Sequence, residues 1–235
     1  MQKIIHREYE RGVGEHEWLH TRFSFSFADW YEPTRMGFGA LRVINDDIID
    51  AQSGFGKHPH ANMEIITIVT HGAVTHEDSM GNTYKVPQGD IQVMSAGTGV
   101  VHAEFNNEDE PLELFQIWIH PREKNVEPQY AQKSFGESKE KNVFELLVSG
   151  EKDNGALWIN QDAYVSRVCI EEGKTLEYVL KNNANGVYIF VVNGNIKIEN
   201  DELLSRDAMG VWETSSVAMS GKETSDLLIF EVPMK

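Results

Sequence analysis

Short apolar runs separated by polar turns recur along most of the chain. The runs are dominated by Val, Ile, Phe and Trp, and Gly, Asn and Asp punctuate them. They include FGALRVI, MEIITIVT, DIQVMS, LFQIWIH, ALWINQ, VYIFVVNG, AMGVWE and DLLIFEVP. This pattern predicts β-strands, and many short strands at such spacing are typical of a β-barrel or jelly roll. We therefore expect an all-β fold.

Two segments differ from these simple strands. Residues 42–50, RVINDDIID, are typical of a hairpin with a polar turn, because Asn and Asp favour turn conformations. Residues 140–147, EKNVFELL, have the spacing of one short turn of helix.

An internal repeat divides the chain. Residues 65–78, IITIVTHGAVTHED, resemble residues 187–200, VYIFVVNGNIKIEN, since each is an apolar run, a glycine and then alternation into an acidic turn. Further on, GDIQVMSAG resembles RDAMGVWET. Two copies of one β unit would fill the chain, and the polar stretch 120–142 predicts their junction. We expect two domains, residues 1–135 and 136–235.

Charge and composition narrow the classes of partner. The 235 residues carry a formal net charge of −16, from 37 acidic and 21 basic residues. Such a surface repels phosphate, so we expect no direct nucleic-acid or membrane binding.

The single cysteine, Cys169, excludes an intramolecular disulfide and is expected to be a buried thiol. Without a signal-peptide core or an apolar stretch of about 18 residues, a cytoplasmic protein is expected, and a monomer is the simplest state.

The histidines gather in the first half. All nine lie at or before His120, so only the first copy of the repeat can offer an imidazole site. His58 and His60 are two residues apart, as are His102 and Glu104, and side chains at i and i+2 share one face of a strand. Two such strands side by side would bring together three ring nitrogens and one carboxylate, which suits a first-row metal. Histidines that only satisfy buried hydrogen bonds are the other interpretation of these pairs.

The remaining histidines give weaker signals. HEWLH, from His16 to His20, fits the pattern of zinc proteases, but that pattern needs a helix. The nearby glycines and the strand-like alternation TRFSFSF argue against a helix there. We expect loop or pocket-rim positions for His16 and His20, and solvated or structural roles for His71 and His76.

Four stretches resemble the signature sequences of the pirin family, within the cupin superfamily: MGFGALRVINDD, GFGKHPHANMEIITIV, EDSMGN and MSAGTGVVHAE. The resemblance is dense from Trp18 to Trp118 and weaker beyond. It implies a bicupin, with two β-barrel (jelly-roll) domains, of which the first binds metal and the second is degenerate.

Carried onto this chain, the family's metal ligands are His58, His60, His102 and Glu104. The resemblance implies one first-row divalent metal ion, with iron first and Zn, Mn, Ni, Co and Cu as other candidates. In many cupins the carboxylate ligand is the glutamate of the first motif, which is Glu64 here. In pirins it follows the third histidine, so the resemblance favours Glu104.

The resemblance also implies a reaction. Some pirins open flavonols such as quercetin at the 2,3-bond with O₂, so a quercetin 2,3-dioxygenase activity is expected, with Glu104 as ligand, catalytic base or both. Apolar side chains would enclose the flat substrate, and the candidates are Phe23, Phe25, Phe27, Phe55, Met94 and Trp118. Other pirins are regulators that bind a protein partner, with the metal as a redox switch. A metal that only stabilises the barrel is the third alternative.

Overall fold

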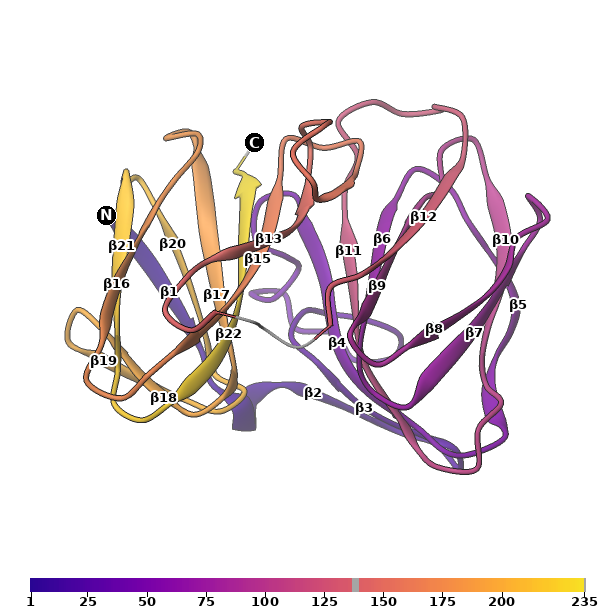
Figure 1. The fold of residues 1–235 in the computed structure, drawn as a ribbon, viewed down its shortest axis with the longest axis horizontal. Helices are drawn as coiled ribbons and strands as arrows, with labels where there is room; N and C mark the ends of the chain where they lie inside the picture. The colour runs from indigo at the N-terminus through magenta and orange to yellow at the C-terminus, as the bar shows by residue number, and fades with distance from the viewer. Residues whose placement is uncertain (137–139, 235) are drawn as a thin grey trace.

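The computed structural model describes residues 1–136 and 140–234, in which the strands form four sheets in two similar halves (Figure 1). In the first half, a seven-stranded sheet has the order β12 (Gln129–Ser134), β9 (Asp90–Ser95), β6 (Glu64–His71), β11 (Leu112–Ile119), β4 (Leu41–Ile49), β3 (Leu19–Phe23) and β2 (Gly12–Glu15). A four-stranded sheet has the order β5 (Ser53–His60), β10 (Val100–Asn106), β7 (Ala73–Asp78) and β8 (Thr83–Pro87). Buried Val69 and Leu114 of the large sheet share an apolar cluster with Val74 of the small one. The two sheets therefore enclose one interior.

The second half repeats this plan. Its seven-stranded sheet has the order β1 (Gln2–His6), β20 (Ala208–Trp212), β17 (Asn185–Asn193), β22 (Ser225–Pro233), β15 (Tyr164–Ile170), β13 (Glu145–Ser149) and β14 (Leu157–Trp158). Its four-stranded sheet has the order β16 (Thr175–Val179), β21 (Ser216–Gly221), β18 (Asn195–Ile198) and β19 (Asp201–Leu204). Both halves are jelly rolls of two sheets, which confirms the predicted all-β bicupin.

The predicted internal repeat is confirmed by the strand order. β6 and β17 each lie third in the order of a large sheet, and after a tight turn each leads into the small sheet, through β7 and β18 respectively. Gly72 makes the first of these turns with φ of 75°, and a Cβ there would lie 3.0 Å from the carbonyl oxygen of Pro111. Only glycine accepts that conformation and that approach at little cost.

The N-terminal strand pairs across the two halves. β1 is hydrogen-bonded to β20 of the second half, with Ile4 opposite Gly210. It takes the place beside β20 that β12 takes beside β9 in the first half. In Figure 1 the indigo strand β1 accordingly lies among the orange and yellow strands. The pattern of apolar runs did not foresee this pairing, and the domain limits 1–135 and 136–235 stay a prediction.

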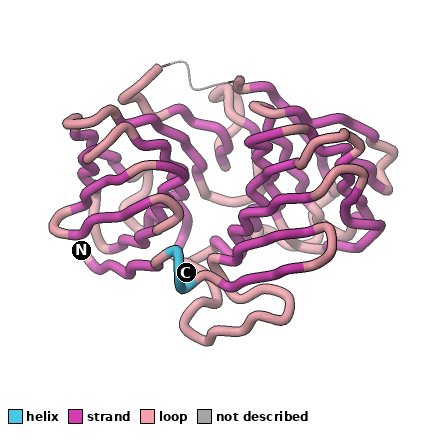
Figure 2. Tube along the Cα trace, turned by 90° about the horizontal axis from the view of Figure 1, so that it is seen from below, coloured by secondary structure: helices cyan, strands magenta, loops and turns pink. Residues whose placement is uncertain are grey.

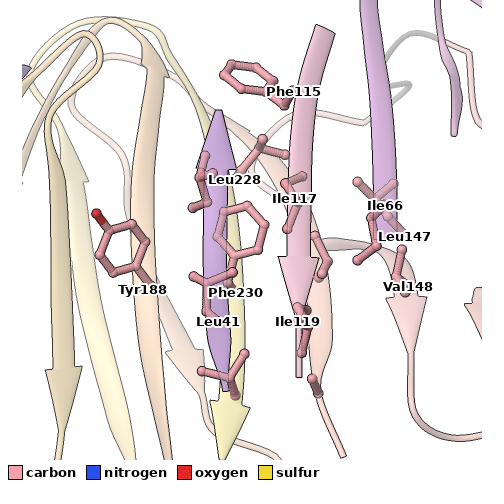
Figure 3. Packing of buried hydrophobic residues seen from close by; sticks show 14 of the residues in the cluster. Leu41, Ile66, Phe115, Ile117, Ile119, Leu147, Val148, Tyr188, Leu228 and Phe230 are labelled. Atoms are coloured by element: carbon pink, nitrogen blue, oxygen red, sulfur yellow. The ribbon is translucent and has the colours of Figure 1, made fainter. Parts of the chain in front are cut away.

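The two large sheets pack against each other through a shared apolar core. In Figure 3, Leu228 and Phe230 of β22 lie beside Leu41, Ile117 and Ile119 of the first half. Phe230 and Ile117 are fully buried. The opposite face of each large sheet covers the interior of its own half. Both faces of each large sheet are therefore buried.

Two local predictions were wrong. Residues 42–50 are not a hairpin, because Leu41–Ile49 is one continuous strand, β4, and the chain turns only after it. Residues 140–147 form a turn and then the strand β13 instead of a helix, because Leu147 and Val148 are buried in the core between the halves. The thiol of Cys169 is half-buried. The predicted junction at 120–142 includes residues 137–139, which lie outside the described residues.

The one helix among the described residues is a single 3₁₀ turn, η1 (Glu8–Glu10), drawn in cyan in Figure 2. No helix in residues 1–136 or 140–234 has the length and apolar character needed to cross a membrane.

We expect Phe230→Ala to lower the free energy of unfolding by about 3–5 kcal/mol, because it leaves a cavity in the core that joins the halves. Urea unfolding followed by intrinsic fluorescence measures the change. Leu204→Ala is the control, since Leu204 is 53% exposed and should change stability by no more than about 0.5 kcal/mol. A Phe230→Ala variant as stable as this control would contradict the shared core.

Candidate metal centre

The two predicted ligand pairs lie on neighbouring strands of the small sheet. β5 and β10 run antiparallel, with His58 opposite His102 and His60 opposite Val100. β5 is the edge strand of that sheet, so Pro59 removes no interior hydrogen bond. The edge position is as predicted, but Pro59 lies near the end of β5 and not at its start.

The three imidazoles converge. The ring centroids of His58 and His102 are 4.4 Å apart, and that of His60 lies 4.9 Å from each of them. One nitrogen of each ring lies within 4.8 Å of the others, which is close enough for all three to ligate one metal ion. The pairing of β5 with β10, together with the alternation of side chains along each strand, thus produces the cluster.

A sharp turn before β10 brings His102 into place. Gly97 has φ of 47°, and a Cβ at this residue would lie 2.1 Å from the carbonyl oxygen of Val126. Any side chain would therefore displace the loop that leads into β10. Glycine at this position fixes where His102 and Glu104 enter the small sheet.

The environment keeps the imidazoles of His60 and His102 neutral, which is the form that binds metals. Burial, together with the neighbouring His102 and His58, lowers the pKa of His60 to about 4. Burial, followed by His58 and His76, lowers the pKa of His102 to about 3. The Nδ1–H of His58 donates a hydrogen bond of 2.8 Å to the carbonyl oxygen of Gly56, which orients the ring and leaves Nε2 free to ligate.

Glu104 is buried beside the cluster. Its Oε1 accepts hydrogen bonds from Gln92 Nε2 at 2.5 Å and from Thr67 Oγ1 at 3.3 Å, and its Oε2 accepts one from Gln116 Nε2 at 2.8 Å. These donors are neutral, so they hold the carboxylate in place without cancelling its charge. Ligand atoms of Glu104, His102 and His76 form a second close group.

Glu64 faces the other way. On β6, Ile65 lines the site cavity, whereas Ile66 packs into the core between the halves. Glu64 shares the face of Ile66, where its carboxylate accepts hydrogen bonds from Ser95 Oγ at 2.7 Å and Asn160 N at 3.1 Å. Its carboxylate therefore links the two halves, and this geometry favours Glu104 as the carboxylate of the cluster.

Aromatic rings form the walls of a cavity of about 160 Å³ above the cluster. Trp118 packs edge-on against His60, with centroids 4.8 Å apart, and Phe27 packs edge-on against Trp118 at 5.2 Å. The lining residues are Phe27, Asn45, Asp47, Phe55, His58, His60, Ile65, His102, Glu104, Gln116 and Trp118. Of the expected walls, Phe27, Phe55 and Trp118 line it, whereas Phe23, Phe25 and Met94 are buried elsewhere.

Comparison with known proteins places this geometry in a family. The family model named Pirin matches residues 6–119, and the model of the quercetinase C-terminal cupin domain matches residues 146–232. A protein of Pseudomonas aeruginosa, provisionally named a quercetin 2,3-dioxygenase, is 43% identical over 97% of this chain and 99% of its own. The quercetin 2,3-dioxygenase of Escherichia coli K12 is 39% identical over 97% of this chain and 98% of its own. The chain belongs to the pirin family.

Solved structures agree with this assignment. The bacterial pirin YhhW of Escherichia coli, in complex with nickel(II), is 38% identical and superposes with a TM-score of 0.92 over 99% of both chains. A quercetin 2,3-dioxygenase of Acinetobacter baumannii, 18% identical, superposes with a TM-score of 0.80 over 97% of this chain and 85% of its own. The second likeness concerns the fold alone, and the predicted pirin bicupin is confirmed.

This pirin contains buried polar atoms that a bound cation and its ligands would satisfy. Within the described residues, both ring nitrogens of His102, Trp118 Nε1 and Gln116 Oε1 are buried and make no hydrogen bond. Each such atom costs about 1–3 kcal/mol, so their gathering at one cavity needs an explanation. Three neutral imidazoles and a carboxylate form a donor set that fits a first-row divalent ion.

Sequence analysis missed several polar residues of the site. Asn45 and Asp47 were assigned to a turn, yet both line the cavity from β4. Gln92 and Gln116, which hold Glu104, stand alone in otherwise apolar runs. A polar residue at an inward position of such a run was the available signal, because the alternation of the strand places it inside.

The histidines outside this cluster occupy different environments. The HEWLH segment forms a turn followed by β3, so it cannot place two histidines on one helical face. His20 is half exposed and pairs with Glu15. His71 is exposed, whereas His76 is completely buried next to His102.

We expect Glu104→Ala to lose bound metal and Glu64→Ala to keep it. Glu64→Ala should instead lower the free energy of unfolding by about 1–3 kcal/mol, because the buried N–H of Asn160 loses its acceptor. Elemental analysis and urea unfolding of both variants give the two measurements. Loss of metal from Glu64→Ala with retention in Glu104→Ala would reverse the assignment.

A second prediction concerns Asp47, whose pKa burial raises from 3.8 to about 7, with smaller effects from Asp46 and Glu104. Between these values the folded protein holds a proton that the unfolded chain releases, so its stability falls as pH rises. Asp47→Asn removes this loss. The unfolding free energy of the variant minus that of the metal-free wild type should rise by about 1 kcal/mol per pH unit in this window. A difference independent of pH would contradict the assignment.

Proposed function

We propose that this protein is a metal-dependent oxygenase of the quercetin 2,3-dioxygenase type, which opens flavonols with O₂. The observation that carries the proposal is the convergence of His58, His60 and His102 beside buried Glu104 in a cavity with aromatic walls. The names of two relatives support the same reaction class.

His58, His60, His102 and Glu104 would hold the metal ion, leaving open positions on a six-coordinate centre. When bound, a first-row divalent ion supplies Lewis-acid and O₂ chemistry at this point. Iron is our proposed metal. N/O donor sites bind Ni²⁺ more tightly than Fe²⁺, so the nickel complex of YhhW is consistent with the same donors holding iron in a cell.

The cavity selects a flat ring. Phe27, Phe55 and Trp118 present apolar surfaces to it, and Phe55 also packs against His58 with centroids 6.3 Å apart. Its volume of about 160 Å³ is below the roughly 300 Å³ at which sites begin to enclose a drug-sized ligand. The ring that carries the reacting hydroxyl would enter, while the rest of the flavonol stays at the mouth.

Glu104 would manage the proton of the substrate. Its carboxylate is 3% exposed and is held by Gln92, Thr67 and Gln116, so its position relative to a ring in the cavity is fixed. A carboxylate at that point can take the proton from the 3-hydroxyl of a flavonol and favour the anionic substrate. Gln92→Ala or Gln116→Ala would loosen it while leaving the histidines in place.

We expect the iron-loaded protein to consume quercetin in the presence of O₂ with release of carbon monoxide. His58→Ala and His102→Ala should lower the rate at least about 100-fold, because each removes a nitrogen of the cluster. Loss of flavonol absorbance and trapping of carbon monoxide measure the reaction. His71→Ala is the matched control, since His71 is exposed and lies outside the cavity.

Two results would overturn the enzyme proposal. One is a fully metal-loaded protein that leaves every flavonol unchanged, and metal-dependent binding of a protein partner would then be the function to test. The other is full activity in a metal-free His58→Ala variant.

A further inference from the structure

A buried His–Asp pair lies directly behind the proposed metal ligands. On β7, which pairs with β10, His76 is opposite Glu104 and Asp78 is opposite His102. The side chains of His76 and Asp78 are both 0% exposed, and His76 Nε2 lies 3.0 Å from Asp78 Oδ2. The proposed metal chemistry gives this pair no role, although Asp78 belongs to the motif EDSMGN.

Asp78 is fixed in orientation by four donors. Its Oδ1 accepts the backbone N–H groups of Met80 at 2.9 Å and Asn82 at 3.1 Å. Its Oδ2 accepts Asn82 Nδ2 at 2.8 Å and faces His76. The several hydrogen bonds to the charged form, with Asn82 contributing the largest, outweigh burial and lower the pKa of Asp78. The motif therefore presents a carboxylate oxygen, which can only accept, to His76.

This carboxylate selects the tautomer of His76. An ionised carboxylate has no proton to give, so His76 must carry its proton on Nε2 and donate it. The other nitrogen, Nδ1, is then an acceptor. It is buried and has no hydrogen-bond partner in the described part of the chain.

The free acceptor lies next to His102, whose two ring nitrogens are both buried and make no hydrogen bond within the described residues. The ring centroids of His76 and His102 are 5.3 Å apart, and a hydrogen bond between two imidazoles spans about 5 Å between centroids. The ring of Tyr130 packs against that of His76 with centroids 4.7 Å apart, and this contact restrains the ring of His76. His58, by contrast, already has the carbonyl oxygen of Gly56.

We propose that His76 and Asp78 are positioning residues: in the metal-loaded protein, His76 Nδ1 accepts the N–H of His102, and this leaves the second nitrogen of His102 to ligate the metal. A ligating histidine usually donates its other N–H to such an acceptor, and removal of that acceptor typically costs 10–100-fold in metal affinity. The inference rests on the metal site proposed above and adds a chain of three side chains, Asp78, His76 and His102.

Asp78→Asn tests the chain with almost no change in shape. Because two backbone N–H groups point at Oδ1, the amide oxygen of the variant should take that position and its NH₂ should face His76. His76 would then have to accept at Nε2 and carry its proton on Nδ1. Two N–H groups would face each other between His76 and His102, so the acceptor would be lost.

The experiment uses the full chain loaded with Zn²⁺, which is diamagnetic, and has two readouts. Competition with a chelator gives metal affinity, and ¹⁵N–¹H spectra of the histidine rings give their tautomers. We expect Asp78→Asn and His76→Leu to lower Zn²⁺ affinity 10–100-fold, and Asp78→Asn to move the His76 proton to Nδ1 even without metal. His76→Gln should restore most of the affinity, because one amide can donate to Asp78 and accept from His102.

Glu77→Gln is the matched control, since Glu77 is the exposed residue between His76 and Asp78 and should bind Zn²⁺ as the wild type does. Wild-type affinity in Asp78→Asn and His76→Leu would overturn this inference alone. So would two Zn²⁺ ions per wild-type chain, because the group His76, His102 and Glu104 would then be a second metal site. A wild type that binds no metal at all would overturn the proposed function as well.

Discussion

The large sheet of the first half is buried on both faces, and the position of the site depends on that constraint. Along β6, Ile66 packs into the core between the halves and Ile65 into the barrel. A shift in register by one residue would turn every side chain of β6 to the opposite face of the sheet. Glu64 would then point into the barrel in place of its neighbours. The contact between the halves therefore also determines which side chains face the candidate metal centre.

The fold and the candidate ligand pairs could be read from the sequence because both depend on local alternation. Apolar runs predicted the strands, and the spacing within His58–His60 and His102–Glu104 placed each pair on one face. The unequal distribution of histidines predicted which half holds the site. These signals lie within single strands, so no knowledge of distant contacts was needed to use them.

The errors concern residues whose partners lie far away in the chain. Asp46 and Asp47 suggested a turn, but Asp46 is paired with Arg11 at 3.2 Å and Arg206 at 2.8 Å, and Asp47 is inside the barrel. Such partners make two acidic residues acceptable within a strand, against their local preference. Likewise, β1 pairs with β20 across most of the chain, and the structural importance of His76 depends on its packing behind β10.

The second half shows what the same fold does without a site. Its strands β16 and β21 correspond in sheet order to β5 and β10, and they direct Tyr178, Val217 and Met219 into an apolar interior. The first half instead buries imidazole nitrogens and amide groups that, among the described residues, are incompletely hydrogen-bonded. Each costs stability that an apolar side chain would not. Because the two halves share a core, the apolar half can stabilise the polar one, and a bound metal would recover part of the cost by satisfying those nitrogens. The duplicated fold is thus specialised: the second copy contributes apolar packing, and the first contributes the candidate metal-ligating side chains.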